Sequence, residues 1–266
     1  MKIFRWIVAV LAVVVTLLRI GLYLTLSDID VAPEIKCEKE IFEVTCDTKD
    51  EELLKYVTAT DAQDGEIDNI AIERMYFLTD NKSKITFVAI DSDKNITKLT
   101  KDIIYTDYIG PRIYAKTSGI FYLNDRTCRF PLTAEDQFSG DISSRVKIIS
   151  NNFSNRQIGS YKAQAKVSNY YGTTLDINFR FYVFPEPLKY TIELKDYIIY
   201  VKKGDKKPDF KSYIKNTTAN KNNIKIDDSA LDMNKDGSYE VLYRVGNDDN
   251  SPDGFSRIIV VVGDNR

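Results

Sequence analysis

An internal repeat constrains the fold of this chain more than any other feature, because a repeated unit folds as one structural module. The copies begin with Ala-Pro-Glu-Ile at 32–35 and Gly-Pro-Arg-Ile at 110–113, and the third begins after Pro-Glu-Pro at 185–187. The period is therefore about 77 residues. It predicts three modules, at 32–108, 109–185 and 186–266.

Two of the copies share a turn motif. Ala-Thr-Asp-Ala-Gln-Asp-Gly-Glu-Ile at 59–67 aligns without a gap with Ala-Glu-Asp-Gln-Phe-Ser-Gly-Asp-Ile at 134–142. The third copy has a different sequence there, at 216–225. Aspartate followed by glycine is typical of tight turns, so we expect the same corner in the first two modules.

Runs in which apolar and polar residues alternate follow these motifs, as expected for strands with one buried face. Turn residues separate the runs, and after residue 31 only Glu51 to Tyr56 indicates a short helical turn. We therefore predict an all-β protein made of three tandem antiparallel sandwiches. The residues expected to point inward are Ile85, Phe87 and Ala89; Tyr161, Ala163, Ala165 and Val167; Leu175, Ile177, Phe179, Phe181 and Val183; Tyr239, Val241, Tyr243 and Val245; Ile258, Val260 and Val262.

These motifs resemble those of the bacterial surface immunoglobulin-like domains, which occur in tandem on cell-surface proteins. The resemblance rests on the Pro-x-Ile openings, the Asp-Gly corners and the Gly-Ser-Tyr that begins a strand at 159–161 and 237–239. It covers nearly all of the chain after the N-terminal apolar segment. The resemblance implies immunoglobulin-like modules that act as spacers, stalks or adhesive domains, and it brings no catalytic residues.

The N-terminal segment at 6–26 is apolar and long enough to cross a bilayer as one helix. Lys2 and Arg5 precede it, which predicts a short cytoplasmic tail at 1–5 and an extracytoplasmic C-terminal part. The contact with the membrane would run from Trp6 to Leu26. Because Arg19 lies toward the outer end, its side chain could reach that interface or pair with another helix.

A cleaved signal peptide is the alternative interpretation of the same segment. Thr25 and Ser27 are small residues at the positions that a signal peptidase requires. Cleavage near Ser27 would release a secreted protein, whereas retention would give a single-pass protein of the cell membrane.

The composition excludes several classes of function. The formal net charge is −2 and no basic stripe is present, so we expect no nucleic-acid partner. The chain contains no histidine, which removes the commonest general base and metal ligand. We therefore expect a protein that is not an enzyme and has no catalytic or cofactor-binding residues.

The three cysteines do not have the spacing of a zinc site. Cys37 and Cys46 lie in one candidate hairpin and could form a disulfide bond in an oxidising compartment. The turn that this pairing requires would be made by Ile41 and Phe42, which are poor turn residues. Cys128 alternates with apolar residues, as a buried thiol would.

Two kinds of binding site remain as candidates. Asp61 and Asp64 in the first corner, and Asp136 and Asp141 in the second, could supply oxygen ligands for calcium. The other interpretation is that each aspartate caps its own turn. No other metal or cofactor is indicated.

Tyr170 and Tyr171 lie at the tip of a predicted hairpin, where exposed aromatic rings are suited to recognition. The sequence therefore predicts a non-catalytic, membrane-anchored stalk, or an adhesion or interaction protein, on a bacterial cell surface. Its partner would be an unknown protein or glycan. The alternative is a single-span subunit of a membrane complex, with the modules as spacers.

Overall fold

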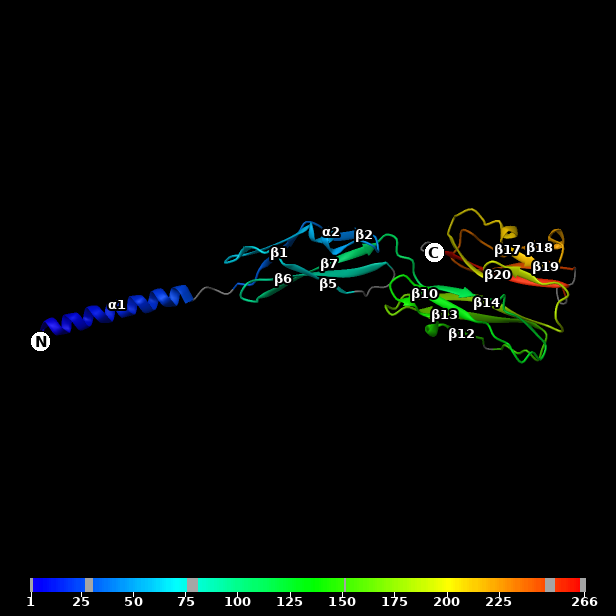
Figure 1. Cartoon of the computed structure of the whole chain (residues 1–266), viewed down its shortest axis with the longest axis horizontal. Helices are drawn as coiled ribbons and strands as arrows, with labels where there is room; N and C mark the ends of the chain where they lie inside the picture. Colours follow the sequence, from blue (N-terminus) through cyan, green and yellow to red (C-terminus); the bar gives the residue numbers. More distant parts are fainter. Residues whose placement is uncertain (1, 27–30, 76–80, 151, 247–251, 264–266) are drawn as a thin grey trace. The chain divides into compact units, whose positions relative to one another are not determined.

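The computed structural model describes residues 2–26, 31–75, 81–150, 152–246 and 252–263. The chain divides into two compact units (Figure 1). Unit 1 comprises Met1–Met75 and Ser83–Ile104, and unit 2 comprises Tyr76–Lys82 and Tyr105–Arg266. The predicted modules at 109–185 and 186–266 both fall within unit 2, and the division into three domains stays a prediction.

The chain begins with helix α1, Lys2–Leu26, which contains the apolar segment predicted at 6–26. Within the described residues, no helix is both long enough and apolar enough to cross a membrane. Ser27, at the alternative cleavage site, lies outside the described residues. Anchorage and secretion both stay predictions.

The strands of unit 1 form two sheets, with the orders β1-β3-β4 and β2-β7-β6-β5. The predicted inward residues Ile85, Phe87 and Ala89 are completely buried, and the Phe42 and Phe87 ring centroids lie 5.7 Å apart. The elements are β1 (Glu34–Cys37), β2 (Ile41–Val44), α2 (Asp50–Leu54), β3 (Val57–Asp61), β4 (Gly65–Glu66), β5 (Ile70–Met75), β6 (Lys82–Ile90) and β7 (Ile96–Tyr105).

The hairpin predicted around Cys37 and Cys46 is wrong. Strand β1 pairs with β3, whereas β2 belongs to the other sheet. The chain crosses from one sheet to the other between them, which avoids placing Ile41 and Phe42 in a tight turn. The disulfide bond considered for these cysteines is not formed. Instead, the Cys37 thiol donates a hydrogen bond to the Lys39 carbonyl oxygen.

The first sandwich of unit 2 has sheets ordered β11-β10-β8 and β12-β13-β14-β9. The inward residues predicted for β13 and β14 are all buried, as the alternating pattern requires. Strand β9 pairs with β14 in parallel, which the prediction of purely antiparallel sandwiches missed. The elements are β8 (Arg112–Ala115), β9 (Ile120–Tyr122), β10 (Leu132–Asp136), β11 (Gly140–Asp141), η1 (Ser143–Arg145), β12 (Lys147–Ile149), β13 (Gly159–Ser168) and β14 (Thr174–Phe184).

The second sandwich repeats this arrangement, with sheets β15-β17 and β16-β20-β19-β18. Strand β16 is again parallel to the last strand, β20. Of the predicted inward residues only Tyr239 is not fully buried. The elements are β15 (Ile192–Leu194), β16 (Ile198–Lys202), η2 (Phe210–Tyr213), β17 (Ile214–Thr217), η3 (Lys221–Asn223), β18 (Lys225–Asp227), β19 (Gly237–Val245) and β20 (Gly254–Gly263).

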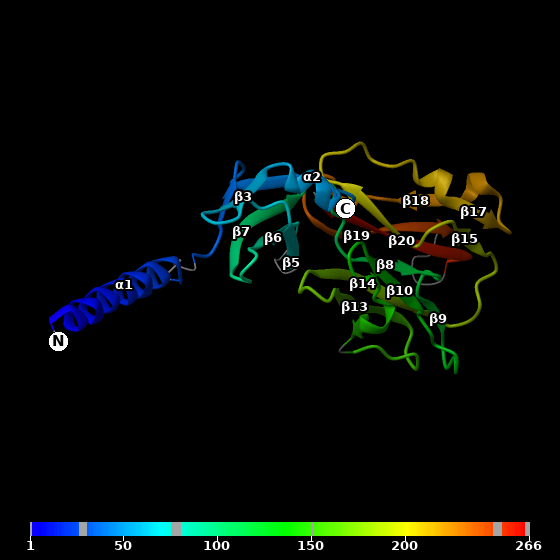
Figure 2. The same cartoon turned by 60° about the vertical axis from the view of Figure 1, so that its left-hand side comes forward.

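The two sandwiches of unit 2 share part of a hydrophobic core. One face of β20 contributes Ile258, Val260 and Val262 to the core of its own sandwich. The opposite face contributes Ile259 and Val261 to the core of the first sandwich. The sheet containing β19 and β20 thus lies against β14, as both views show (Figures 1 and 2). Burial of β20 on both faces ties the two sandwiches together.

Candidate functional site

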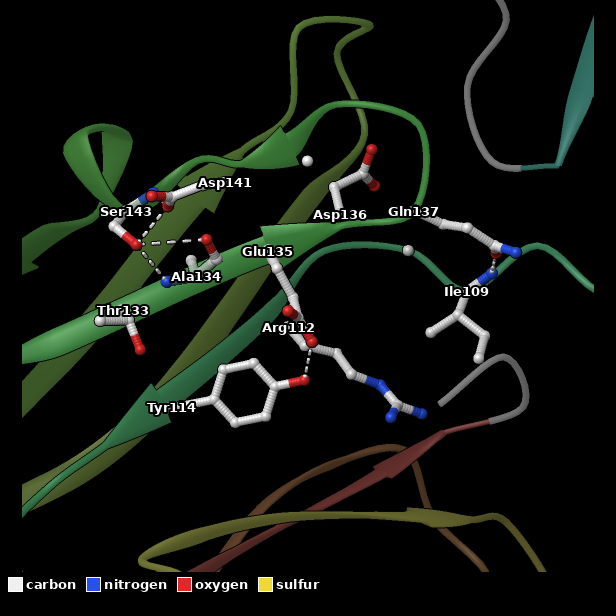
Figure 3. Close-up of a pocket in the computed structure, with 12 residues that line it drawn as sticks. Ile109, Arg112, Tyr114, Thr133, Ala134, Glu135, Asp136, Gln137, Asp141 and Ser143 are labelled. Carbon is white, nitrogen blue, oxygen red and sulfur yellow. Dashed lines mark hydrogen bonds between the residues drawn. The ribbon is translucent and has the colours of Figure 1, made fainter.

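A groove of about 610 Å³ lies on the first sandwich of unit 2 (Figure 3). Its walls come from β8, β10 and β11. Because Ile113 of β8 and Ala134 of β10 are buried, their neighbours along each strand point outward. The outward side chains in the groove include Arg112, Tyr114 and Glu135. The groove therefore lies on the outer face of this sheet.

The polar side chains of the groove contact one another. The Tyr114 hydroxyl donates to Glu135 Oε1 over 2.5 Å. Burial raises the pKa of Tyr114, and the hydrogen bond to Glu135 raises it further. At the other end, the Ile109 amide donates to Gln137 Oε1 over 2.8 Å (Figure 3). Polar groups at both ends of the groove are thus bonded to one another within the chain.

The two predicted Asp-Gly corners are confirmed and have the same geometry. Asp61 pairs with Gly65 across the first corner, as Asp136 pairs with Gly140 across the second. Both glycines have positive φ, 76° and 66°, which glycine adopts without a steric penalty. In each corner Oδ1 of the aspartate accepts hydrogen bonds from the amides two and three residues later. Each aspartate therefore caps its own turn.

The other two calcium candidates are also engaged within the chain. Both carboxylate oxygens of Asp64 accept from Ser92, at 2.7 Å from the amide and 2.8 Å from the hydroxyl. Asp141 Oδ1 accepts from the hydroxyl and amide of Ser143, which lower the pKa of Asp141. The amides of Asp64 and Gln63 lower the pKa of Asp61 in the same way. Among the described residues, no group of three or more histidine, cysteine, aspartate or glutamate side chains is arranged to hold a metal ion.

Asp136 differs from Asp61 because it also belongs to a buried hydrogen-bond network. Its Oδ2 accepts from the Tyr108 hydroxyl at 2.7 Å and from the Asn169 amide nitrogen at 3.3 Å. Asp136 and Asn169 are only 4% and 2% exposed. Burial raises the pKa of Tyr108, and the contact with Asp136 raises it further. The network joins the linker before β8 to the Asp-Gly corner and to the β13–β14 hairpin.

The same Asn169 side chain fixes the backbone of the hairpin tip. Its Oδ1 accepts from the amides of Tyr171 and Thr173, both at 2.9 Å. Tyr170, beside these bonded residues, is 60% exposed, while Tyr171 is half-buried. The Arg145 guanidinium lies 4.8 Å from the Tyr170 ring centroid. Of the predicted pair, Tyr170 therefore carries the accessible aromatic surface.

The structure also reveals a buried ion pair that joins the two sandwiches of unit 2. Arg257 of β20 is 1% exposed and contacts Glu240 of β19 over 2.8 Å. Its two terminal nitrogens donate to the carbonyl oxygens of Arg180 and Ser118 in the first sandwich, each over 2.6 Å. Burial lowers the pKa of Arg257, whereas Glu240 opposes this shift and keeps the cation paired. We call Arg257 and Glu240 the clasp.

The clasp and its neighbours cover sheet edges of the first sandwich. Glu240 Oε1 accepts from the Arg180 amide of β14, and Ser238 bonds both the amide and the carbonyl of Asn178. On the opposite sheet, the Tyr200 hydroxyl bonds the amide and the carbonyl of Ile113. Side chains of one sandwich thus satisfy backbone groups of the other, which a strand edge would otherwise expose.

Gly119 is the position where the clasp fits most tightly. It has φ 72°, and a Cβ there would lie 2.7 Å from Arg257 Nη2. We expect Gly119→Ala to lower the free energy of unfolding by about 2–4 kcal/mol, from backbone strain and overpacking together. Urea unfolding followed by circular dichroism measures this change. Gly140→Ala is the matched control, because a Cβ at Gly140 meets nothing within 4 Å, and it should cost only about 1–2 kcal/mol. Equal losses would contradict the tight fit.

Sequence reasoning missed the clasp and the buried Asn169 network. One signal was available, since the five apolar residues at 258–262 form a continuous run instead of alternating. Such a run is typical of a strand that is buried on both faces. No comparable local signal marks Asn169, because its partners lie 33 and 61 residues away.

No protein-family model matches the chain, and no curated protein matches it. Several solved structures are similar at low identity. The M60 catalytic domain with CBM51-1 and CBM51-2 of Clostridium perfringens ZmpB is 10% identical, with a TM-score of 0.24, over 62% of this chain and 32% of that one. Drosophila N-cadherin EC1-4 is 12% identical, with a TM-score of 0.23, over 57% of this chain and 49% of that one.

The fibronectin(III)-like modules of Clostridium thermocellum CbhA are 12% identical, with a TM-score of 0.19, over 56% of this chain and 94% of that one. The chain spans about a third and about half of the first two structures. At this similarity the comparisons assign neither a family nor an activity.

Proposed function

We propose that this chain is a non-catalytic interaction protein of a bacterial cell surface, held at the membrane by α1. The observation that carries the proposal is the hairpin tip of unit 2. Tyr170 is the most exposed large hydrophobic side chain described outside α1. An aromatic ring on a fixed backbone can bind a partner at low entropic cost, because binding removes little further conformational freedom from the side chain and backbone.

The packing of the two sandwiches of unit 2 against each other supports the same proposal. A recognition surface gains from a rigid scaffold, because its geometry is set before the partner arrives. The clasp and the shared core restrict motion of the two sandwiches relative to each other, which a simple linker at 185–187 would allow. In the groove, Glu135 and Asp141 are occupied by hydrogen bonds to Tyr114 and Ser143, which suits a binding surface better than acid–base chemistry.

The alternative function is a single-span subunit of a membrane complex. Its support is Arg19, an exposed cationic side chain within the apolar segment 6–26 of helix α1. Such a side chain is costly in a bilayer and is often paired with another helix. In this case α1 would make the specific contact, and the sandwiches would hold other components at a distance.

Exchange of residues 6–26 for an unrelated membrane span separates the two functions. After chemical crosslinking on intact cells, we expect the exchanged protein to recover the same partners as the original. Tyr170→Ala should reduce that recovery at least about tenfold, which corresponds to about 1.4 kcal/mol. Tyr122→Ala, in a different strand of the same sandwich, is the control. Loss of partners on exchange of the span, with no effect of Tyr170→Ala, would favour the membrane-complex function.

A further inference from the structure

Strand β12 lies at an outer edge of a sheet in unit 2. In the order β12-β13-β14-β9, strand β12 is outermost and pairs with β13 alone among the described residues. The edge of β8 is covered by Tyr200. Strand β14 pairs with β9 only at 182–184, and before that point Ser238 and the clasp bond its backbone at Asn178 and Arg180. An open edge presents backbone amide and carbonyl groups to which another strand can pair.

The β12 edge is also hydrophobic on both faces. Ile148 lies opposite the buried Ala165, so it is on the core side, whereas Ile149 lies opposite Gln164 on the outer side. Ile148 and Ile149 are nevertheless 42% and 47% exposed. A strand added beside β12 would cover both isoleucines, and backbone pairing would gain hydrophobic burial.

The equivalent strand of the second sandwich does not share this character. Strand β18 occupies the same outer position in β16-β20-β19-β18. Its apolar residue, Ile226, is half-buried, and Asp227 follows it. Mixed charges and modest exposure are the usual protection of a sheet edge against pairing. The exposed isoleucines of β12 are therefore a particular feature of the first sandwich.

The segment that contains β12 and β13 is basic. Residues 142–175 contain five basic residues and no acidic residue, although the whole chain has a net charge of −2 and Asp141 and Asp176 flank this segment. Lys147 of β12 lies directly opposite Lys166 of β13. Lys166 has an ion pair with Asp176, but Lys147 has none among the described residues. Opposed like charges are unfavourable, so carboxylates beside them would be stabilising.

An aromatic residue and an arginine complete the surface at one end. Arg145 donates from Nε to the Ser168 carbonyl oxygen, which keeps its guanidinium beside the exposed Tyr170 ring. Tyrosine and arginine are the residues that most often dominate binding energy at interfaces. We define the β12 edge surface as Arg145, Lys147, Ile148, Ile149 and Tyr170.

We propose that the β12 edge surface binds an extended, acidic segment of a partner protein, which adds to the sheet beside β12. The carboxylates of that segment would face Lys147, and its apolar side chains would cover Ile148. A second copy of this chain is a poorer fit, because its own β12 edge has the same positive charge. The inference rests on the proposed interaction function and names the surface and partner class that would perform it.

A synthetic peptide tests this proposal with the full-length chain in detergent. The probe is a fluorescent peptide of alternating glutamate and valine, compared with one in which lysine replaces glutamate. Fluorescence anisotropy should show binding of the acidic peptide only. Hydrogen exchange should show protection of the amides at 147–149 in the complex.

Variants locate the contact. We expect Arg145→Glu with Lys147→Glu to weaken binding at least about tenfold, or about 1.4 kcal/mol, through charge reversal. Ile149→Thr should weaken it by a smaller factor while leaving the fold intact, which circular dichroism verifies. Ile226→Thr on β18 is the matched control and should leave binding unchanged.

Three outcomes would overturn the proposal. The acidic peptide fails to bind, or both peptides bind equally, or binding occurs without protection of β12. Dimerisation crosslinked through position 149 would instead identify a second copy as the occupant. If the peptide fails while crosslinking on cells still depends on Tyr170, the interaction function stands and only this choice of surface and partner is wrong.

Discussion

Replacement of Arg257 by methionine is expected to lower the free energy of unfolding by about 3–5 kcal/mol, because it removes the buried partner of Glu240 from an ion pair. The Glu240 side chain is only 9% exposed, and its remaining cationic partner would be Arg180, which is 47% exposed. The carbonyl oxygens of Arg180 and Ser118 would lose their donors at the same time. Urea unfolding of the full chain, followed by circular dichroism, measures the loss.

A double-mutant cycle distinguishes the ion pair from simple packing. Arg257→Met with Glu240→Leu should recover a large part of the lost stability, because no uncompensated charge then remains. Arg180→Met is the matched control, since Arg180 contacts the same carboxylate over 3.1 Å but is 47% exposed. It should cost less than about 1 kcal/mol. If Arg257→Met also costs less than this, the clasp does not stabilise unit 2.

Replacement of Asp136 by alanine is expected to cost about 2–4 kcal/mol, since it removes both a turn cap and the centre of a buried network. The Tyr108 hydroxyl and the Asn169 amide group would lose their common acceptor in a buried site. We also expect faster hydrogen exchange at the hairpin tip, because Asn169 then holds the amides of Tyr171 and Thr173 less firmly. Hydrogen-exchange mass spectrometry detects this local effect.

The chain contains its own control for this substitution. Asp61→Ala removes the same turn cap in unit 1, where the described residues provide no equivalent of the Tyr108 and Asn169 contacts. It should cost only about 0.5–1.5 kcal/mol. Asp136→Asn, which keeps an acceptor in the turn, should fall between the two. Equal costs at Asp61 and Asp136 would show that the buried network adds nothing.

The corners and the inward faces of the strands could be predicted because they depend on neighbouring residues. The turn at Asp136 needs only a carboxylate, two following amides and a glycine that accepts positive φ, all within five residues. Alternation places Ala163 and Ile177 on the buried side by the geometry of a single strand. Tyr170 was likewise predicted at a hairpin tip, where it lies.

Strand pairing was less predictable because its partners are distant in the sequence. The Cys37–Cys46 hairpin was inferred from proximity along the chain, but β1 and β2 bond to different sheets. The parallel pairs of β9 with β14 and of β16 with β20 have no local signature at all. A hydrophobic pattern states which face is buried, not which strand lies beside it.

The sequence by itself determined the repeated β-sandwich pattern, the Asp-Gly corners and the apolar N-terminal segment, because each depends on residues that are close along the chain. Only the tertiary structure decided that Arg257 reaches Ser118, 139 residues away, and that Asn169 reaches Tyr108, 61 residues away. Burial makes these contacts strong, since a polar group removed from water must find its partner within the fold. In the described part of the chain, the same folding left β12 without a neighbour on its outer side, while it covered the edge of β8 and the part of β14 that β9 does not reach.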